Sequence, residues 1–308
     1  MLTFCDILAK KNRWCYYSIL VTIMKITEKL KLSKQLISFE VFPPKTDVAF
    51  ESIEKSVREL AAFSPDFMSV TYGASGGTSE YTLKIASMIK NELGTASIAH
   101  LTCASTTKEK ISEMLERFKE NNIENILALR GDLPENLNER VGDYYEYASD
   151  LVKVIKAHNC FDIGAACYPE GHPESSSPEE DLENLKYKTD CGVDFLTTQM
   201  FFDNDVFYDF LNKARQKQIN VPIFAGIMPI TSINQVDRII RLSGARMPTE
   251  LESVFEKYKN APNNLQKATL DYAVRQINDL LENDVKGVHI YTMNKPYVAE
   301  AVLKGISR

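Results

Sequence analysis

The feature that most limits the fold of this 308-residue chain is a regular alternation of short apolar, β-branched runs with amphipathic helical segments. The runs predict buried strands, and the segments between them show the apolar spacing of helices. Predicted strands cover residues 36–42, 67–71, 97–103, 126–130, 163–168, 195–199, 223–228 and 288–292. Predicted helices cover residues 48–62, 79–92, 107–121, 145–158, 178–191, 204–217, 231–243 and 266–283.

Strands that alternate with helices must run parallel, because each return to the same edge of the sheet needs a crossover. Eight such units over about 270 residues predict a closed (β/α)8 TIM barrel, an α/β fold, rather than an open sheet. Residues 248–264 form an extra segment in the last unit. No low-complexity linker marks a boundary between domains. We therefore expect a single catalytic barrel over residues 35–308, preceded by an N-terminal extension and lead-in over residues 1–34.

The N-terminal extension has two interpretations. Lys10, Lys11 and Arg13 precede an apolar run at 16–24, an order that faintly resembles a secretory signal. The run has no A-x-A-like cleavage site and is shorter than the ~20 residues that cross a bilayer. We therefore favour a dispensable extension, with Met24 as the natural start and no membrane association.

Charge and composition exclude several classes of function. Lys and Arg number 36 against 42 Asp and Glu, and no basic block is present, so nucleic acid is not an expected partner. The six cysteines have no CxxC spacing and the four histidines no HExxH spacing. We expect reduced thiols in a cytoplasmic protein, and no metal site.

Polar residues gather where the predicted strands end, which is the end of a TIM barrel that carries active sites. No G-x-G-x-x-G or G-x-x-x-x-G-K-[ST] loop follows a strand, so a nucleotide cofactor would be held by side chains and loop amides. Arg130, His172 and Lys188 are the available partners for an anionic pyrophosphate. Alternatively, these polar residues are only strand-end caps and turns.

Nine segments resemble one family in its order along the chain. They are residues 38–45 (SFEVFPPK), 70–74 (VTYGA), 100–103 (HLTC), 129–134 (LRGDLP), 147–152 (YASDLV), 166–173 (ACYPEGHP), 197–203 (TTQMFFD), 226–230 (GIMPI) and 289–295 (HIYTMNK). Over residues 35–300 the chain resembles the methylenetetrahydrofolate reductases, in their short bacterial form. The resemblance implies an FAD enzyme that reduces 5,10-methylenetetrahydrofolate to 5-methyltetrahydrofolate with hydride from NADH or NADPH, by a ping-pong mechanism. It also implies a cytoplasmic homo-oligomer in one-carbon metabolism and methionine biosynthesis.

The resemblance assigns the catalytic roles to Glu40 and Asp132. Glu40 would be the general acid that protonates N10 of the folate, so that the ring opens to a 5-iminium ion. A carboxyl group donates a proton near neutral pH only where its surroundings favour the protonated form, and the apolar neighbours of Glu40 predict burial. Asp132 would lie beside the flavin, where its charge favours hydride donation and stabilises the cationic folate intermediate. Alternatively, Glu40 is an ion-paired carboxylate and Asp132 a turn residue.

The remaining site residues also follow from the resemblance. Substrate-binding positions are Glu40, Thr71, Gln199 and Lys295. Cofactor-binding positions are Tyr72, Ala74, His100, Arg130, Gly131, Asp132, Ala148, Tyr168, His172, Asp181, Asn184 and Lys188. Two departures concern substrate binding: Lys295 stands where some relatives carry Arg, and Ile239 where some carry Phe. Lys presents a point charge instead of a planar fork.

Three rival functions are weighed against this one. Another FAD barrel oxidoreductase with a different acceptor would lack the combination of Glu40, Asp132 and Gln199. In a barrel that only binds folate or flavin and has no enzymatic activity, NADH would not reduce the bound flavin. A metal-dependent aldolase or hydrolase would need ligand spacing that the chain does not show.

Overall fold

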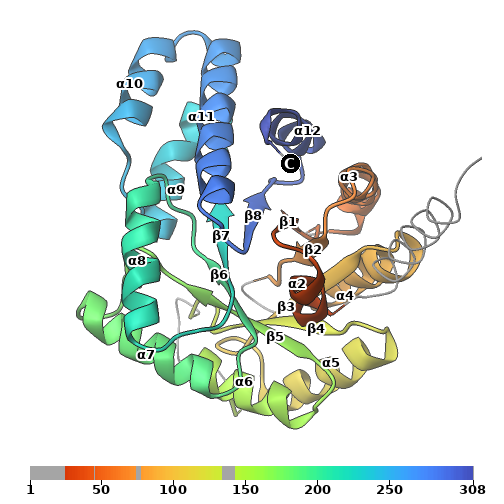
Figure 1. Ribbon diagram of the computed structural model, residues 1–308. Coiled ribbons are helices and arrows are strands. Elements are labelled where there is room, and N and C mark those ends of the chain that lie inside the picture. The colour runs from red at the N-terminus through yellow and green to blue at the C-terminus, as the bar shows by residue number, and fades with distance from the viewer. Residues whose placement is uncertain (1–24, 45, 74–77, 134–142, 308) are drawn as a thin grey trace, which may run out of the picture.

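The computed structural model describes residues 25–44, 46–73, 78–133 and 143–307. Eight parallel strands form a closed barrel in chain order, and β8 pairs with β1 (Figure 1). The strands are β1 Leu36–Val41, β2 Phe67–Val70, β3 Ala96–Thr102, β4 Asn125–Leu129, β5 Asp162–Cys167, β6 Phe195–Thr198, β7 Ile223–Ile227 and β8 Gly287–Tyr291. The predicted single (β/α)8 TIM barrel is therefore confirmed, with every strand within one or two residues of its predicted bounds.

Helices surround the barrel and return the chain from each strand to the next (Figure 1). They are α3 Phe50–Ala61, α4 Ser79–Ser87, α5 Lys108–Glu120, α6 Ala148–Ala157, α7 Pro178–Asp190, α8 Asn204–Gln216, α9 Val236–Ser243, α10 Thr249–Tyr258, α11 Pro262–Glu282 and α12 Pro296–Gly305. Short turns precede α3 and α9 at Asp47–Ala49 and Ile233–Gln235, and a π-helical turn, Met88–Glu92, continues α4. The extra segment forms α10, which packs on α11.

The cap of α7 shows how the sequence starts a helix. Ser177 has an extended backbone, and its side chain accepts a hydrogen bond from the Glu180 backbone N–H at 3.1 Å. Pro178 occupies the first turn, where its missing N–H costs nothing, and acidic residues there favour the positive end of the helix dipole. The predicted start of this helix is confirmed.

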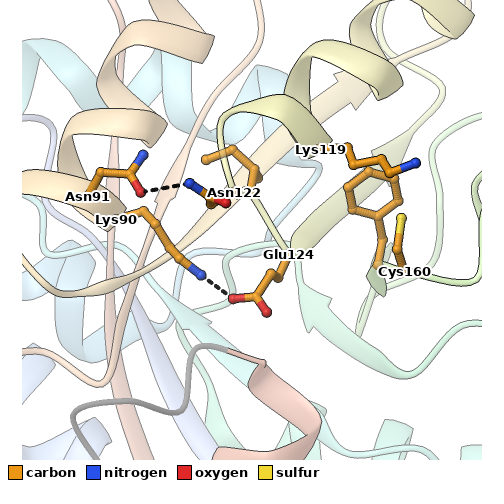
Figure 2. A pocket seen from close by; sticks show the side chains of 8 residues that line it. Lys90, Asn91, Lys119, Asn122, Glu124 and Cys160 are labelled. Atoms are coloured by element: carbon orange, nitrogen blue, oxygen red, sulfur yellow. Dashed lines mark hydrogen bonds and ion pairs between the residues drawn. The ribbon is translucent and has the colours of Figure 1, made fainter.

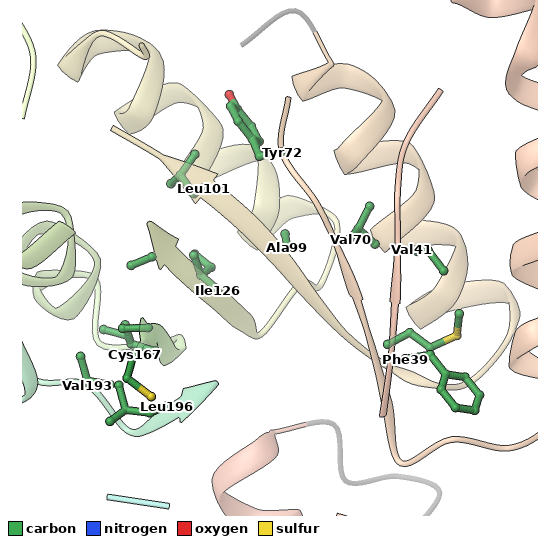
Figure 3. Close-up of a cluster of buried hydrophobic side chains, with 14 of the residues drawn as sticks. Phe39, Val41, Val70, Tyr72, Ala99, Leu101, Ile126, Cys167, Val193 and Leu196 are labelled. Carbon is green, nitrogen blue, oxygen red and sulfur yellow. The ribbon is translucent and has the colours of Figure 1, made fainter. Parts of the chain in front are cut away.

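Side chains alternate between the two faces of each strand, as a period of two requires. On β1, Ile37, Phe39 and Val41 face the surrounding helices and belong to the main hydrophobic core, part of which Figure 3 shows. Leu36 faces the barrel interior instead, in a second cluster with Phe67, Phe195 and Phe224. This second cluster fills the amino-terminal end of the barrel.

Glycines leave room for these rings inside the barrel. A Cβ atom added at Gly287 would lie 2.6 Å from the Leu36 carbonyl oxygen and 2.5 Å from the Phe224 ring. One added at Gly164 would lie 2.8 Å from Leu127. The absence of side chains at these two positions therefore permits the aromatic filling of the barrel floor.

A helix that the sequence pattern did not predict closes the same end of the barrel. This helix, α2 (Ile26–Leu32), buries Ile26 in the second cluster. The Ile26 N–H donates to Asn125 Oδ1 at 3.0 Å, and the Thr27 N–H and hydroxyl donate to Asp162 Oδ2 at 2.8 and 2.7 Å. The lead-in before β1 thus packs against the barrel. The residues with signal-like character lie outside those that the structure describes.

Candidate active site at the carboxyl end of the barrel

Three titratable side chains meet inside the barrel above the aromatic floor. Glu40 on β1, His100 on β3 and His289 on β8 are 7%, 4% and 2% exposed. Glu40 Oε2 lies 3.8 Å from His100 Nε2 and 3.8 Å from His289 Nε2. Among the described residues, no lysine or arginine nitrogen lies within 4.0 Å of the Glu40 carboxyl group. Glu40 is therefore buried as predicted, and the two imidazole rings are the basic groups closest to its carboxyl group within the described part of the chain.

His100 has an environment that disfavours its charged form. Burial lowers the pKa of His100 to about 4; the nearby Glu40 opposes this shift and His289 adds to it. His100 Nε2 forms no hydrogen bond within the described part of the chain, and neither does the buried hydroxyl of Thr102 on the same strand. Buried polar atoms without partners are uncommon in proteins, so this pair is a position where a bound group could donate or accept.

Just after β4, the backbone at Gly131 passes very close to the side chain of Thr102 on β3. Gly131 has φ of +79°, and a Cβ atom there would lie 2.8 Å from Thr102 Cβ. Only glycine adopts this conformation without strain, and here it also avoids a clash. Asp132 follows it and is exposed. Gly131, between Arg130 and Asp132 in the chain, thus lies next to the Thr102 side chain.

Arg130 is already paired through its guanidinium fork. Arg130 Nη2 donates to Glu174 Oε1 at 2.7 Å, and Nη1 donates to the other carboxylate oxygen. This pairing raises the pKa of Arg130 and lowers that of Glu174. A pyrophosphate bound by Arg130 would have to share or displace Glu174, a residue that the sequence reasoning did not include.

The loop after β5 brings Tyr168 and His172 together. Their rings lie 4.6 Å apart, edge to face. The Glu174 N–H donates to His172 Nδ1 at 3.1 Å, which leaves Nε2 as the hydrogen-bearing nitrogen of the neutral ring. Burial lowers the pKa of His172 and raises that of Tyr168 to about 12.

Helix α7 lines the same side of the site. Lys188 donates from Nζ to the Ala166 carbonyl oxygen at 2.7 Å, and burial lowers its pKa. Asp181 accepts a hydrogen bond from Ser175 Oγ at 3.2 Å. Asn184 lies between Asp181 and Lys188 on the same helix and is exposed.

The predicted substrate residues lie at the ends of other strands. Gln199, after β6, accepts a hydrogen bond at Oε1 from the Met200 N–H at 2.9 Å, which leaves its amide hydrogens available. Lys295, after β8, donates to Thr231 Oγ1 at 2.8 Å. Thr71, directly after β2, is partly buried. Ile239 is 8% exposed and packs in a cluster with Phe202.

Three other positions are predicted to contact the cofactor, and the structure describes two of them. Ala148 is the first residue of α6 and is partly buried. Tyr72 is buried beside β2, and burial raises the pKa of its phenol. Ala74 lies outside the described residues, so its predicted contact stays untested.

Sequence reasoning missed the polar residues beneath Glu40. Ser38, Ser69 and His289 are buried, and each serine hydroxyl contacts the His289 ring inside the barrel. Each stands at an inward position of its strand, alternating with apolar residues that face the helices. That period-two pattern of polar residues within otherwise apolar strands was the signal that could have identified them.

A cavity of about 390 Å³ lies at the other end of the barrel (Figure 2). Its lining includes Lys90, which is paired with Glu124, and Asn91, which is hydrogen-bonded to Asn122 at 3.4 Å. None of the predicted site residues lines it. Because TIM barrels carry their chemistry at the carboxyl ends of the strands, we place the site there and not in this cavity.

Two classes of feature are absent from the described parts of the chain. No helix there is long and apolar enough to cross a membrane. No group of three or more His, Cys, Asp or Glu residues there could hold a metal ion.

Solved structures with the same fold are distant in sequence. A protein from Clostridium thermocellum that binds two copies of 5-methyl-5,6,7,8-tetrahydrofolic acid matches with a TM-score of 0.60 and 14% identity, over 91% of this chain and 99% of its own. An oxaloacetate acetylhydrolase matches with a TM-score of 0.51 and 12% identity, over 91% of this chain and 82% of its own. At these identities the likeness shows the barrel fold alone.

Sequence relatives are much closer. The 5,10-methylenetetrahydrofolate reductases of Pectobacterium carotovorum and Escherichia coli are 35% and 34% identical over 266 residues, which cover 86% of this chain and 88% of each relative. Methylenetetrahydrofolate reductase (NADH) 1 of Arabidopsis thaliana is 34% identical over 300 residues, 92% of this chain and 51% of that protein. The profile of the methylenetetrahydrofolate reductase family matches residues 25–307. This chain therefore belongs to the methylenetetrahydrofolate reductase family.

Proposed function

We propose that the protein reduces 5,10-methylenetetrahydrofolate to 5-methyltetrahydrofolate, with hydride from NADH or NADPH passed through bound FAD in a ping-pong mechanism. Membership of the family supports the folate reduction. The structural observation that carries the proposal is the setting of Glu40, a buried carboxyl group at the active end of the barrel with no Lys or Arg partner among the described residues.

Glu40 would act as the general acid on the folate. Protonation of N10 opens the five-membered ring and leaves a 5-iminium ion that can accept hydride. A carboxylate held by a Lys or Arg would be stabilised in its charged form and would donate a proton poorly. Among the described residues, the basic groups within 4.0 Å of the Glu40 carboxyl group are two imidazoles, so no Lys or Arg holds Glu40 in its charged form. Its burial also keeps competing water away from the proton.

The residues around β3, β4 and β5 offer what a flavin dinucleotide needs. FAD would supply hydride transfer between nicotinamide and folate. His100 Nε2 and Thr102 Oγ1 are buried with no hydrogen-bond partner among the described residues, and Gly131 lets the backbone approach closely. Arg130, His172 and Lys188 would face the pyrophosphate, with Tyr168 and Asp181 beside them. Tyr72, Ala74, Ala148 and Asn184 remain proposed contacts, and Asp132 would lie beside the flavin ring.

The folate would be held by residues from three other strand ends. Gln199 has amide hydrogens to donate to the pterin edge, because its oxygen is taken by the Met200 N–H. Lys295 presents a single ammonium group, already hydrogen-bonded to Thr231, where a planar guanidinium would offer a fork. Thr71 would contact folate or nicotinamide.

The colour of the purified protein tests this function directly. We expect an absorbance band at about 450 nm that bleaches with NADH or NADPH and returns when methylenetetrahydrofolate is added. A band that bleaches but does not return with the folate would indicate a flavin oxidoreductase with a different acceptor. A colourless protein that binds no added FAD would overturn the proposal. We further propose that the protein is cytoplasmic and that it forms a homo-oligomer. Sedimentation of the purified protein would test the oligomeric state.

A further inference from the structure

The turn that follows β8 holds its backbone in a conformation that few residues adopt. Met293 and Asn294 both have φ of +55°. The Lys295 N–H donates to the Thr292 carbonyl oxygen at 3.0 Å and closes the turn. Two successive non-glycine residues with positive φ cost free energy, and such strain persists where surrounding contacts fix it, often at functional sites. The contacts that fix this turn therefore indicate its role.

Those contacts join the turn to the end of β1. Asn294 Oδ1 accepts a hydrogen bond from the Phe42 N–H at 2.8 Å, and Asn294 Nδ2 donates to the Phe42 carbonyl oxygen at 2.9 Å. Only this orientation of the amide satisfies both Phe42 groups. The Thr292 hydroxyl, in a fully buried side chain, donates to the Glu40 carbonyl oxygen at 2.8 Å. Three hydrogen bonds thus connect positions that are 252 residues apart in the chain.

Side chains supply these bonds because the backbone pairing of the two strands stops earlier. The pairing of β1 with β8 ends at Glu40 and Tyr291. Pro43 and Pro44 follow Phe42 and have no N–H to donate, so the chain does not continue past Phe42 as a regular ladder. The Asn294 amide, with one acceptor and one donor, takes the place of a further residue of β8.

The turn links two groups of the proposed folate site. Glu40, the proposed proton donor, lies two residues before Phe42, and Thr292 holds its carbonyl oxygen directly. Lys295, the proposed folate-binding cation, directly follows Asn294. One side-chain amide therefore fixes the segment that carries the acid against the segment that carries the cation. A displacement of about 1 Å at a reacting group can slow a reaction about 100-fold, so this hold bears on the rate.

We propose that Asn294, assisted by Thr292, is a positioning residue for folate reduction: its amide clamps the end of β1 onto the turn after β8 and so fixes Glu40 relative to Lys295. This inference rests on the proposed function, which assigns the proton to Glu40 and folate binding to Lys295. Asn294 touches neither folate nor flavin in this role. It acts through the two segments whose backbones it connects.

Amide hydrogen exchange tests the clamp without any turnover. In flavin-bound protein labelled with ¹⁵N-phenylalanine, Phe42→Leu identifies the Phe42 amide among the 15 phenylalanines. Phe42 is only partly buried, so its protection depends on the hydrogen bond to Asn294. We expect this amide to exchange at least about tenfold more slowly than an unprotected one, and Asn294→Gly to remove most of the difference. An unprotected Phe42 amide in the unaltered protein, or equal protection in the variant, would overturn the proposal.

The two half-reactions test the positioning role. Gly adopts positive φ freely, so Asn294→Gly removes the amide and keeps the turn conformation accessible. Flavin reduction by NADH should stay within about twofold of the unaltered protein, because it needs neither Glu40 nor Lys295. Reoxidation by methylenetetrahydrofolate should slow about tenfold or more at saturating folate, because Glu40 is no longer held in place. The half-saturating folate concentration should also rise, because Lys295 is released.

Asn278→Ala is the matched control, because it removes the same kind of clamp at the opposite end of α12 from the turn. Asn278 Oδ1 accepts a hydrogen bond from the Ser307 N–H at 2.9 Å, and its Nδ2 donates to the Gly305 carbonyl oxygen at 3.1 Å. This variant should leave both half-reactions and the exchange of the Phe42 amide unchanged. Equal slowing of reoxidation in Asn278→Ala and Asn294→Gly would show that general loosening, and not the Asn294 clamp, is responsible.

The remaining outcomes separate this inference from the proposed function. Normal reoxidation with an unchanged half-saturating folate concentration in Asn294→Gly would show that the clamp is only structural. If Asn294→Gly does not fold, Thr292→Val decides: it removes the hydrogen bond to the Glu40 carbonyl oxygen with little change in shape, and normal reoxidation in it would overturn the positioning role. If the unaltered protein is never reoxidised by the folate, the proposed function fails, whereas hydrogen exchange still reports on the clamp.

Discussion

At the scale of single residues, burial and neighbouring charge decide what each titratable group can do. Glu40 and His100 lie 3.8 Å apart inside the barrel, yet burial keeps His100 neutral near pH 7. An imidazolium in its place would hold Glu40 as a carboxylate and remove the acid. The low pKa of His100 therefore supports the proposed chemistry. It should also reduce the stability of the folded protein at low pH, which can be measured.

The stability of the protein should fall with pH through the titration of His100. Its pKa is about 4 in the folded protein against 6.5 ordinarily, so below pH 6.5 the unfolded chain binds a proton that the folded chain resists. The free energy of unfolding should drop progressively between these pH values, by about 3 kcal/mol for this residue. Urea unfolding at several pH values measures this drop, and His100→Gln should show a shallower dependence. Equal dependence in the two proteins would contradict the shift.

Asp132 should influence the proposed flavin through its charge. It is exposed and directly follows Gly131, whose backbone comes close to Thr102. If it lies beside the flavin ring, Asp132→Asn removes a negative charge that disfavours the reduced anion, so the midpoint potential should rise. Reduction by the nicotinamide would persist while reoxidation by folate slows. A redox titration with Asp203→Asn as a distant control measures this, and an unchanged potential would mean that Asp132 is elsewhere.

At the scale of elements, the amino-terminal helix α2 closes the barrel floor through one buried side chain and two polar anchors. Ile26 is fully buried, whereas Leu32 on the same helix is 38% exposed. We expect Ile26→Ala to lower the free energy of unfolding by about 2–5 kcal/mol, because it leaves a cavity among the rings of the floor. Leu32→Ala is the matched control and should cost much less. Equal losses in urea unfolding would show that α2 does not close the barrel.

The extension before α2 gives a related expectation. Deleting residues 1–23 should leave flavin content and turnover unchanged, because Ile26 and Thr27 and their anchors on Asn125 and Asp162 are retained. Purification of the shortened protein followed by absorbance and activity measurements tests this. A large loss of folded protein would show that the extension packs on the barrel.

The strands were predictable and some helices were not, for physical reasons. Buried parallel strands are continuous apolar runs, and the prediction of all eight rests on that single property. Helix α2 has only seven residues, too few for a clear amphipathic period, and α12 follows β8 after a short turn with a largely apolar sequence. The π-helical turn after α4 depends on packing that sequence spacing does not express.

At the scale of the whole molecule, the barrel brings together residues that are far apart in the chain, as Glu40 and His289 are. Family resemblance identified Glu40, His100 and Lys188, each of which the structure places at the carboxyl end of the barrel. Glu174 and the serines beneath Glu40 were not foreseen, because their importance comes from contacts across the barrel.

The central claim, that Glu40 supplies the proton for folate reduction, is tested by separating the half-reactions in Glu40→Gln. Hydride transfer to the flavin needs proximity and orientation but no side-chain proton, so flavin reduction should slow only modestly. Gln preserves size but cannot donate an acidic proton, so folate-dependent reoxidation should fall by about 10²–10⁴-fold. In stopped-flow absorbance, the predicted result is a variant that bleaches with NADH and stays bleached when methylenetetrahydrofolate is added. Near-normal rates for both half-reactions would contradict the account and make Glu40 a structural carboxylate.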